Sequence, residues 1–90
     1  MTRFLQSTVR QVKGDCTAYR AAWSRVGTAA ASANARAWIF HSVQTADTHI
    51  EFIEWKSMQE SDSTMPPQIT AALAELEQFG PGEPRLWQEP

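Results

Sequence analysis

The stretch AWIFHSVQTADTHIEFIEW, residues 37–55, decides the fold of this 90-residue chain. Its two halves, residues 37–45 and 50–55, are dense in aromatic and β-branched residues, which favour β-strands. A link as short as the one between them joins neighbouring antiparallel strands. The stretch therefore predicts a β-hairpin with a tight turn at Ala46 and Asp47.

That turn position also sets which side chains of the two strands share a face. On one face the expected pairs are Val43 with Ile50, His41 with Phe52, and Ile39 with Glu54. On the other face they are Phe40 with Ile53, and Trp38 with Trp55. Both faces are then rich in large apolar groups, and helices packed in one layer cover only one of them. We expect the uncovered face to bind a second copy of the chain, with a monomer that exposes some aromatic residues as the alternative.

Upstream of the hairpin, the sequence predicts a strand and then a helix. Residues 4–12 alternate roughly between polar and apolar and read as a strand. Asp15 or Thr17 is placed to cap the helix that follows. Its apolar stripe recurs at three- and four-residue steps: Tyr19, Ala22, Trp23, Val26, Ala29 and Ala30. We expect this helix to end in a loop near Asn34.

Downstream of the hairpin, a polar loop over residues 57–64 leads to a second helix and a last strand. Prolines 66 and 67 open the helix, where a missing N–H costs nothing. Its apolar positions follow at helical spacing: Ile69, Ala72, Leu73, Leu76 and Phe79. We expect Gly80 in a left-handed cap conformation, and residues 84–88 as a short strand.

The resulting order of elements is βαββαβ. A split pair of βαβ units with right-handed crossovers gives a four-stranded antiparallel sheet with both helices on one face, the ferredoxin-like α+β arrangement. At this length we expect a single domain over residues 1–90.

The composition excludes several classes of function. The chain is 42% hydrophobic and 20% charged, with a net charge of −2, which does not indicate nucleic acid or an anionic membrane as a partner. Its one cysteine, Cys16, cannot build a zinc site and suits a reducing, cytoplasmic setting. His41 and His49 have no metal-ligand spacing, so we expect neither a metal nor another cofactor. We expect His49 to be solvated beside its turn and His41 to face the second copy, near Glu54.

The arginines are scattered among acidic residues, and we expect them to be solvated: Arg3, Arg10, Arg20, Arg25, Arg36 and Arg85.

The segment FIEWKSMQ, residues 52–59, resembles the dimeric α/β-barrel superfamily, and within it the antibiotic-biosynthesis-monooxygenase (ABM) type of domain. In that family the third strand commonly ends in an acidic or apolar residue, Trp, a variable residue and Ser. The turn segment at residues 45–48 and the total length also fit. The family includes cofactor-independent oxygenases of aromatic polyketides and quinols, haem-degrading enzymes, and members of no known activity.

Haem-degrading members of the family use an Asn on the first strand, a Trp at the end of the third strand and a His on the following helix. Trp55 matches this pattern, whereas Thr8 occupies roughly the Asn position and residues 61–77 contain no His. The resemblance therefore favours a cofactor-free oxygenase over haem degradation.

A cofactor-free oxygenase needs only a dry chamber that orients an electron-rich ring and hydrogen-bonds the oxygen where charge develops. The resemblance implies Trp55, Gln6 and Thr8 as catalytic residues. If Trp55 faces the helices, the ligand-binding residues of an aromatic chamber follow: Trp38, Phe40, Trp23 and Tyr19. Two other interpretations stay open: a non-catalytic dimer that binds a hydrophobic ligand or serves a stress or regulatory role, and an interaction module whose aromatic residues simply fill the core.

Overall fold

The computed structural model describes residues 1–59 and 61–90, and it confirms the predicted order of elements. The elements are β1 (Thr2–Gln11), α1 (Cys16–Ser32), β2 (Arg36–His41), β3 (Thr48–Ser57), α2 (Pro67–Ala74), the short 3₁₀ helix η1 (Glu75–Phe79) and β4 (Gly82–Gln88). Among the described residues, no helix is both long and apolar enough to cross a membrane.

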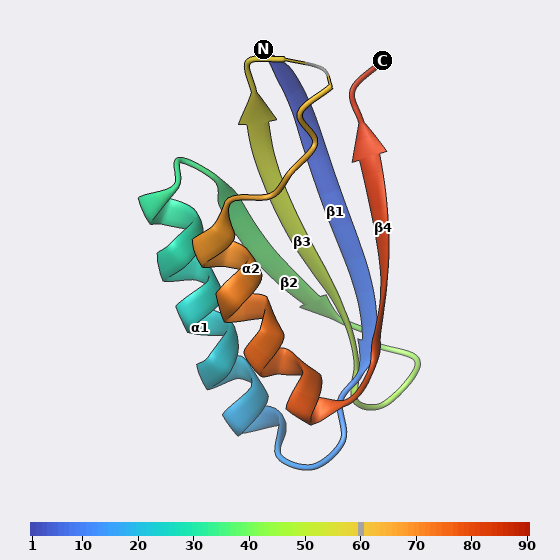
Figure 1. Ribbon diagram of the computed structural model, residues 1–90. Coiled ribbons are helices and arrows are strands. Elements are labelled where there is room, and N and C mark those ends of the chain that lie inside the picture. The colour runs from blue at the N-terminus through green and yellow to red at the C-terminus, as the bar shows by residue number, and fades with distance from the viewer. Residues whose placement is uncertain (60) are drawn as a thin grey trace.

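The strands form one antiparallel sheet in the order β2-β3-β1-β4, with the two long strands β1 and β3 at its centre. Both helices pack on the same face, and the opposite face carries no element (Figure 1). The ferredoxin-like α+β class predicted from the sequence is therefore confirmed.

Helix α1 begins and ends as its sequence predicts. The Asp15 side chain accepts a hydrogen bond from the backbone N–H of Thr17 at 2.8 Å, which satisfies one of the free donors of the first turn. After the last turn, Asn34 takes a left-handed conformation with φ 57°. The apolar stripe of the helix is buried against the sheet: Tyr19, Ala22, Trp23, Val26 and Ala30.

The second helical segment differs in detail from the prediction. It is α-helical only to Ala74 and then tightens into η1, which ends at Phe79. Gly80 has φ 130° and ψ 158°, so the expected left-handed helical cap is wrong. Only glycine fits there, because a Cβ would lie 2.6 Å from the carbonyl oxygen of Gln11. The polar loop predicted over 57–64 includes position 60, which lies outside the described residues.

The register of the β2–β3 hairpin corrects the predicted one by three residues. Trp38 lies opposite Phe52, Phe40 opposite Ile50, and His41 opposite His49 rather than Phe52. The cause is a longer turn.

Strand β2 stops early because Ser42 begins that turn. Its hydroxyl accepts hydrogen bonds from the N–H groups of Gln44 at 3.1 Å and Thr45 at 2.9 Å. Asp47 completes the reversal with φ 63°. An odd-numbered shift moves every β2 side chain to the other face, so the prediction that Trp38 and Phe40 share the face of Trp55 is wrong.

Candidate functional site

Polar residues line the helix-facing side of β1, where a purely apolar core would carry hydrophobic ones. Phe4 and Val12 at either end of this side are buried and apolar, but between them lie Gln6, Thr8 and Arg10. Arg10 is 2% exposed and Thr8 is 6% exposed. The interior of this small domain therefore holds a polar strip, which needs internal hydrogen-bond partners.

Arg10 finds its main partner in Glu51 of β3, which is 1% exposed. Arg10 Nε donates to Glu51 Oε2 at 2.7 Å, and Nη2 donates to Oε1 at 3.1 Å, the bidentate geometry that gives the strongest charge-assisted pairs. Arg10 Nη1 also donates to the carbonyl oxygens of Gly80, at 2.6 Å, and Leu76, at 3.4 Å. The arginine thereby connects both central strands to the end of η1.

Helix α1 adds a third member to this buried pair. The Tyr19 hydroxyl donates to Glu51 Oε2 at 2.7 Å. Burial, and then the hydrogen bond to Glu51, raise the pKa of Tyr19 well above its ordinary value, so this hydroxyl stays protonated and remains a donor. Burial opposes the charge of Arg10, but the hydrogen bond and the charge of Glu51 outweigh it and raise the pKa of the guanidinium.

A cavity of about 250 Å³ opens beside this polar strip, between the sheet and α2. We call it the α2 cavity. Its lining comes from four elements and the adjoining 3₁₀ turn: Gln6, Thr8, Arg10, Glu51, Thr70, Leu73, Ala74, Glu77, Gly82 and Pro84. Gly82 helps to keep it open, because a Cβ there would lie 2.5 Å from Thr8 Cγ2 and 3.0 Å from Arg10 Nη2.

Trp55 lines a different cavity, at the end of β3. This cavity has a volume of about 500 Å³, and its described lining is Trp55, Lys56, Ser57, Met58, Gln59, Asp62, Thr64 and Pro66. Trp55 is 4% exposed, and its indole Nε1 has no hydrogen-bond partner among the described residues. A buried N–H without a partner is uncommon and suits a site that a ligand oxygen completes.

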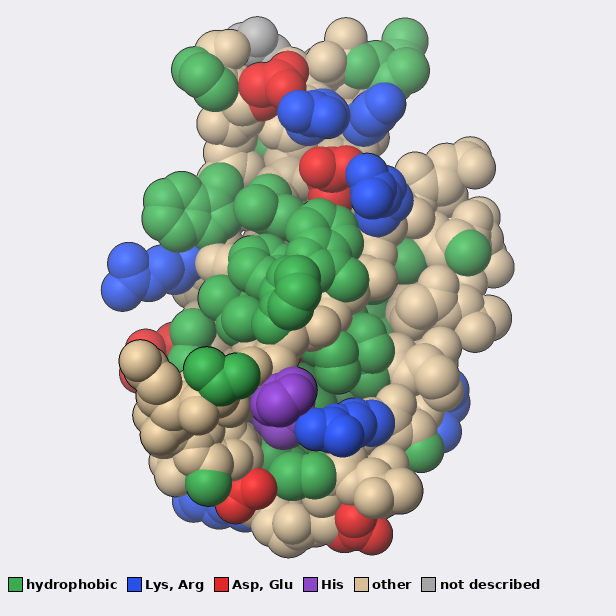
Figure 2. Space-filling view, turned by 180° about the vertical axis from the view of Figure 1, so that it is seen from behind, with side chains coloured by type: hydrophobic (Ala, Val, Ile, Leu, Met, Phe, Trp, Pro, Cys, Tyr) green, Lys and Arg blue, Asp and Glu red, His purple; other side chains and the backbone are tan. Residues whose placement is uncertain are grey.

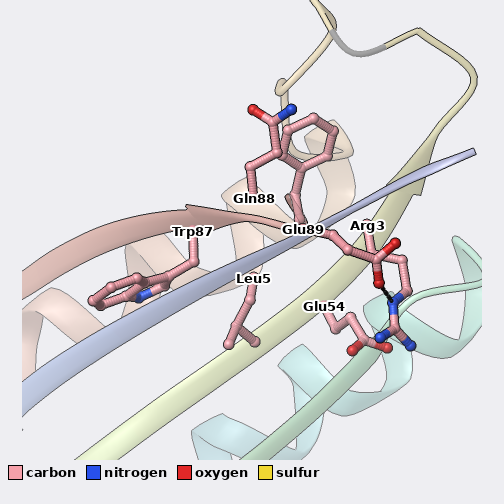
Figure 3. Close-up of a pocket in the computed structure, with 7 residues that line it drawn as sticks. Arg3, Leu5, Glu54, Trp87, Gln88 and Glu89 are labelled. Carbon is pink, nitrogen blue, oxygen red and sulfur yellow. Dashed lines mark hydrogen bonds and ion pairs between the residues drawn. The ribbon is translucent and has the colours of Figure 1, made fainter.

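A third cavity, of about 240 Å³, lies near the end of β1 and β4, and Figure 3 shows it. Arg3 and Glu89 close one side through an ion pair at 2.9 Å. The Trp87 indole N–H donates to the Ser7 hydroxyl at 2.9 Å. Because these polar groups already have partners, this cavity offers a ligand fewer free donors than the other two.

The structure brings some of the predicted site residues together and separates others. Gln6 and Thr8 line the α2 cavity, as the alternation along β1 implies, while Trp55 lines its own cavity on the same face of the sheet. Tyr19 and Trp23 lie in the buried core against α1. Their proposed roles in catalysis or ligand binding stay predictions.

Trp38 and Phe40 are the two predicted chamber residues that the structure places elsewhere. Both lie on the open face, where Trp38 stacks on Phe52 with ring centroids 5.3 Å apart. Phe40 is 61% exposed and meets Phe52 edge to face. The shifted hairpin register is the reason, and neither side chain reaches the cavities under the helices.

Two residues expected in solvent are instead buried in the interior. Arg10 was predicted to be solvated, but counting in twos from Phe4 puts it on the helix-facing side, and this period is the signal that could have found it. His49 is 2% exposed rather than solvated, because β3 starts at Thr48 and its ring packs 4.7 Å from that of Tyr19. Within residues 1–59 and 61–90, no three His, Cys, Asp or Glu side chains cluster closely enough to hold a metal ion.

Comparisons with known proteins place this fold. No protein-family model and no curated protein matches the sequence. Among solved structures, the chain is similar to SnoaB, a cofactor-independent oxygenase from Streptomyces nogalater, with 11% identity, a TM-score of 0.78, and coverage of 100% of this chain and 95% of SnoaB.

Two further solved structures share the arrangement. One is a candidate antibiotic biosynthesis monooxygenase from Bordetella bronchiseptica, with 12% identity, a TM-score of 0.69, and coverage of 100% and 99% of the two chains. The other is Rv0793 from Mycobacterium tuberculosis, with 13% identity, a TM-score of 0.62, and coverage of 93% and 92%. The chain therefore has the ferredoxin-like fold of ABM-domain proteins, as its segment at 52–59 implied. At these identities the likeness establishes the fold and not the reaction.

Proposed function

We propose that this protein is an ABM-like homodimer that oxidises a small aromatic or quinol-type substrate with O₂ and without a cofactor. The observation that carries the proposal is the α2 cavity, because its wall includes a buried, hydrogen-bonded polar strip in a fold shared with a cofactor-independent oxygenase. Gln6 and Thr8 supply neutral hydrogen-bonding groups there, and Trp55 supplies an unpartnered indole N–H on the same face of the sheet.

The chemistry asks little of the protein. A ring-activated CH₂ group loses a proton to water or to Glu77, whose side chain is 63% exposed on the cavity lining. The resulting carbanion gives one electron to O₂, the two radicals combine into a peroxide, and loss of water leaves a carbonyl. The substrate CH₂ is oxidised and O₂ is reduced, so that CH₂ and O₂ give C=O and H₂O. Hydrogen bonds to the developing oxyanion lower the barrier.

The second part of the proposal is the dimer, which covers the open face. Figure 2 shows hydrophobic side chains gathered over the middle of this face, with charged groups around them. Trp38, Phe40 and Phe52 form its aromatic centre, and Arg36 lies over the Trp38 ring at 5.7 Å. A second copy of the same sheet is the occupant that this self-complementary patch suits best, because two-fold pairing covers both patches at once.

The test is oxygen consumption by the purified protein with anthrone- and quinol-type substrates, monitored with an oxygen electrode. We expect turnover above the spontaneous rate with at least one substrate. Absence of turnover with every such substrate, together with measurable binding, would instead support the alternative function, a non-catalytic dimer that binds a small hydrophobic ligand. That alternative is favoured by Trp23 and Tyr19 lying in the filled core rather than in a chamber.

A further inference from the structure

The α2 cavity has a definite charge balance. Its lining contains one cation, Arg10, and two carboxylates, Glu51 and Glu77. Glu51 pairs with Arg10 at 2.7 Å, and Glu77 lies 3.5 Å from Arg10 Nη1. One positive charge thus faces two negative charges, and the cavity carries a net negative charge. A ligand anion entering it meets a carboxylate whose neutralising partner is already engaged.

The hydrogen-bonding capacity left over on this wall is small and specific. Arg10 has five N–H groups and makes four hydrogen bonds, so one N–H on Nη2 keeps no partner among the described residues. Glu51 accepts two bonds on Oε2 and one on Oε1, which leaves acceptor capacity on Oε1. Nη2 and Oε1 are 3.1 Å apart, so a free donor and a free acceptor lie side by side.

A hydroxyl group matches this pair of atoms, because its O–H donates to Oε1 while its oxygen accepts from Nη2. A carboxylate or a ketone has acceptors only and leaves Oε1 unsatisfied. The missing side chain at Gly82 keeps Nη2 accessible, since a Cβ there would lie 3.0 Å from that nitrogen. The cavity volume of about 250 Å³ is also below the roughly 300–1,000 Å³ of pockets for drug-sized ligands.

From these observations we infer that the α2 cavity binds a neutral aromatic compound of one or two rings through a phenolic hydroxyl, read by Glu51 Oε1 and Arg10 Nη2, and that it rejects carboxylated analogues. The inference rests on the proposed function, because it names the substrate class of the same cavity. It makes Glu51 and Arg10 the specificity-determining residues, in addition to any catalytic role of Gln6 and Thr8.

The experiment compares two probes that differ in one group. Binding of 2,6-dihydroxynaphthalene and of 6-hydroxy-2-naphthoate to the full chain is measured by calorimetry under argon, so that no oxidation follows. We expect the neutral diol to bind about tenfold more tightly or better, since each tenfold step corresponds to about 1.4 kcal/mol. Equal or tighter binding of the carboxylate overturns the inference, and so does failure of both probes to bind.

Two pairs of variants assign the binding to this cavity. Ala74→Leu fills the cavity and keeps good helix propensity, whereas Ala71→Leu adds the same volume to an exposed position of α2 outside the lining. We expect the first to weaken diol binding at least tenfold and the second to leave it within a factor of two. Unchanged binding in Ala74→Leu overturns the assignment. Glu51→Gln is less suitable, because it leaves the buried charge of Arg10 without a charged partner.

The second pair tests the charge. Glu77→Gln removes one of the two carboxylates, and we expect it to narrow the preference for the diol over the naphthoate. Glu75→Gln changes the neighbouring turn outside the lining, where Glu75 pairs with Arg25 at 2.8 Å, and should leave the preference intact. An unchanged preference in Glu77→Gln contradicts the electrostatic part of the argument.

Failure of this inference and failure of the proposed function give different results. Tight diol binding with the expected preference, but no oxygen consumption, removes the oxygenase and keeps the site. Oxygen consumption that Ala74→Leu leaves unchanged keeps an oxygenase and removes the α2 cavity as its substrate site.

Discussion

The two faces of the sheet place polar and apolar groups in opposite ways. Under the helices, Arg10 and Glu51 form a charged pair that is almost completely buried, at 2% and 1% exposure. On the open face, Trp38 and Phe52 stack with no element of the chain above them, and Phe40 is 61% exposed. A core that carries charge and a surface that carries aromatic groups both cost stability in an isolated domain. The first is explained by a polar site, and the second by a partner.

The largest expected effect comes from breaking the buried pair. Glu51→Leu leaves the Arg10 guanidinium buried without its carboxylate, and we expect a loss of about 3–5 kcal/mol in the free energy of unfolding. Urea denaturation measures it. The matched control is Glu89→Leu, which breaks the exposed Arg3–Glu89 pair and should cost at most about 1 kcal/mol.

The double variant Arg10→Met with Glu51→Leu sharpens this comparison. It removes both charges together, and buried ion pairs replaced by apolar residues of similar size are often neutral in stability. We therefore expect it to recover most of the stability that Glu51→Leu loses. A double variant as unstable as the single one would mean that packing, and not the unpaired charge, determines the loss.

A charge on the open face should break the dimer. Phe40→Glu places a carboxylate in the aromatic centre of the patch, and we expect the dimer Kd to rise at least about a hundredfold, the effect of losing a well-packed aromatic anchor. Analytical ultracentrifugation reports the mass.

Val43→Glu is the control for that change. The pairing expected from the sequence put Val43 on the interface strand, but the structure places it in the turn after β2 with 93% exposure. It should leave the dimer nearly intact. A wild-type chain that stays monomeric at micromolar concentration would contradict the partner interpretation of this face.

A smaller effect is expected at Trp55. Trp55→Phe keeps most of the apolar volume beside Phe4 and removes the unpartnered indole N–H. If this N–H binds a substrate oxygen, turnover falls by roughly ten- to a hundredfold, the size of one lost hydrogen bond to developing charge, with little change in stability. Trp23→Phe, in the core under α1, is the control and should leave turnover largely unchanged. Equal activity of wild type and Trp55→Phe would exclude this role.

The smallest expected effect is a pH dependence caused by His49. Burial lowers the pKa of His49 below its ordinary value of 6.5, with Arg20 and His41 acting in the same direction and the Asp47 carbonyl and Glu51 opposing it. The unfolded chain then binds a proton more readily than the folded chain. Stability contributed by neutral His49 is fully present above pH 6.5 and decreases as the pH falls below it.

His49→Phe tests this pH dependence, because it removes the titrating group and keeps an aromatic ring against Tyr19. Urea midpoints between pH 7.5 and pH 5 should fall less steeply for this variant than for wild type. His41→Phe, at an exposed position, should keep the wild-type slope. Identical slopes in wild type and His49→Phe would show that burial of His49 is not the cause.

Local patterns predicted the elements of this fold well, because they depend on neighbouring residues. The cap at Asp15, the end of α1 at Asn34 and the start of α2 at the two prolines all follow from short-range chemistry. The position of Trp55 at the end of β3, in a segment that resembles ABM domains, was likewise readable. The hairpin register was not, since one hydroxyl at Ser42 lengthened the turn and reversed the faces of Trp38 and Phe40.

The sequence by itself determined the order of strands and helices, the apolar character of the sheet and the polar positions Gln6 and Thr8 along β1. Only the tertiary structure decided that Arg10 of β1 meets Glu51 of β3 and Tyr19 of α1, residues separated by up to 41 positions in the chain. The physical reason is that a charged side chain enters the core only where a partner from another element neutralises it. That partner is set by strand register and helix packing, and a pattern of neighbouring residues does not contain it.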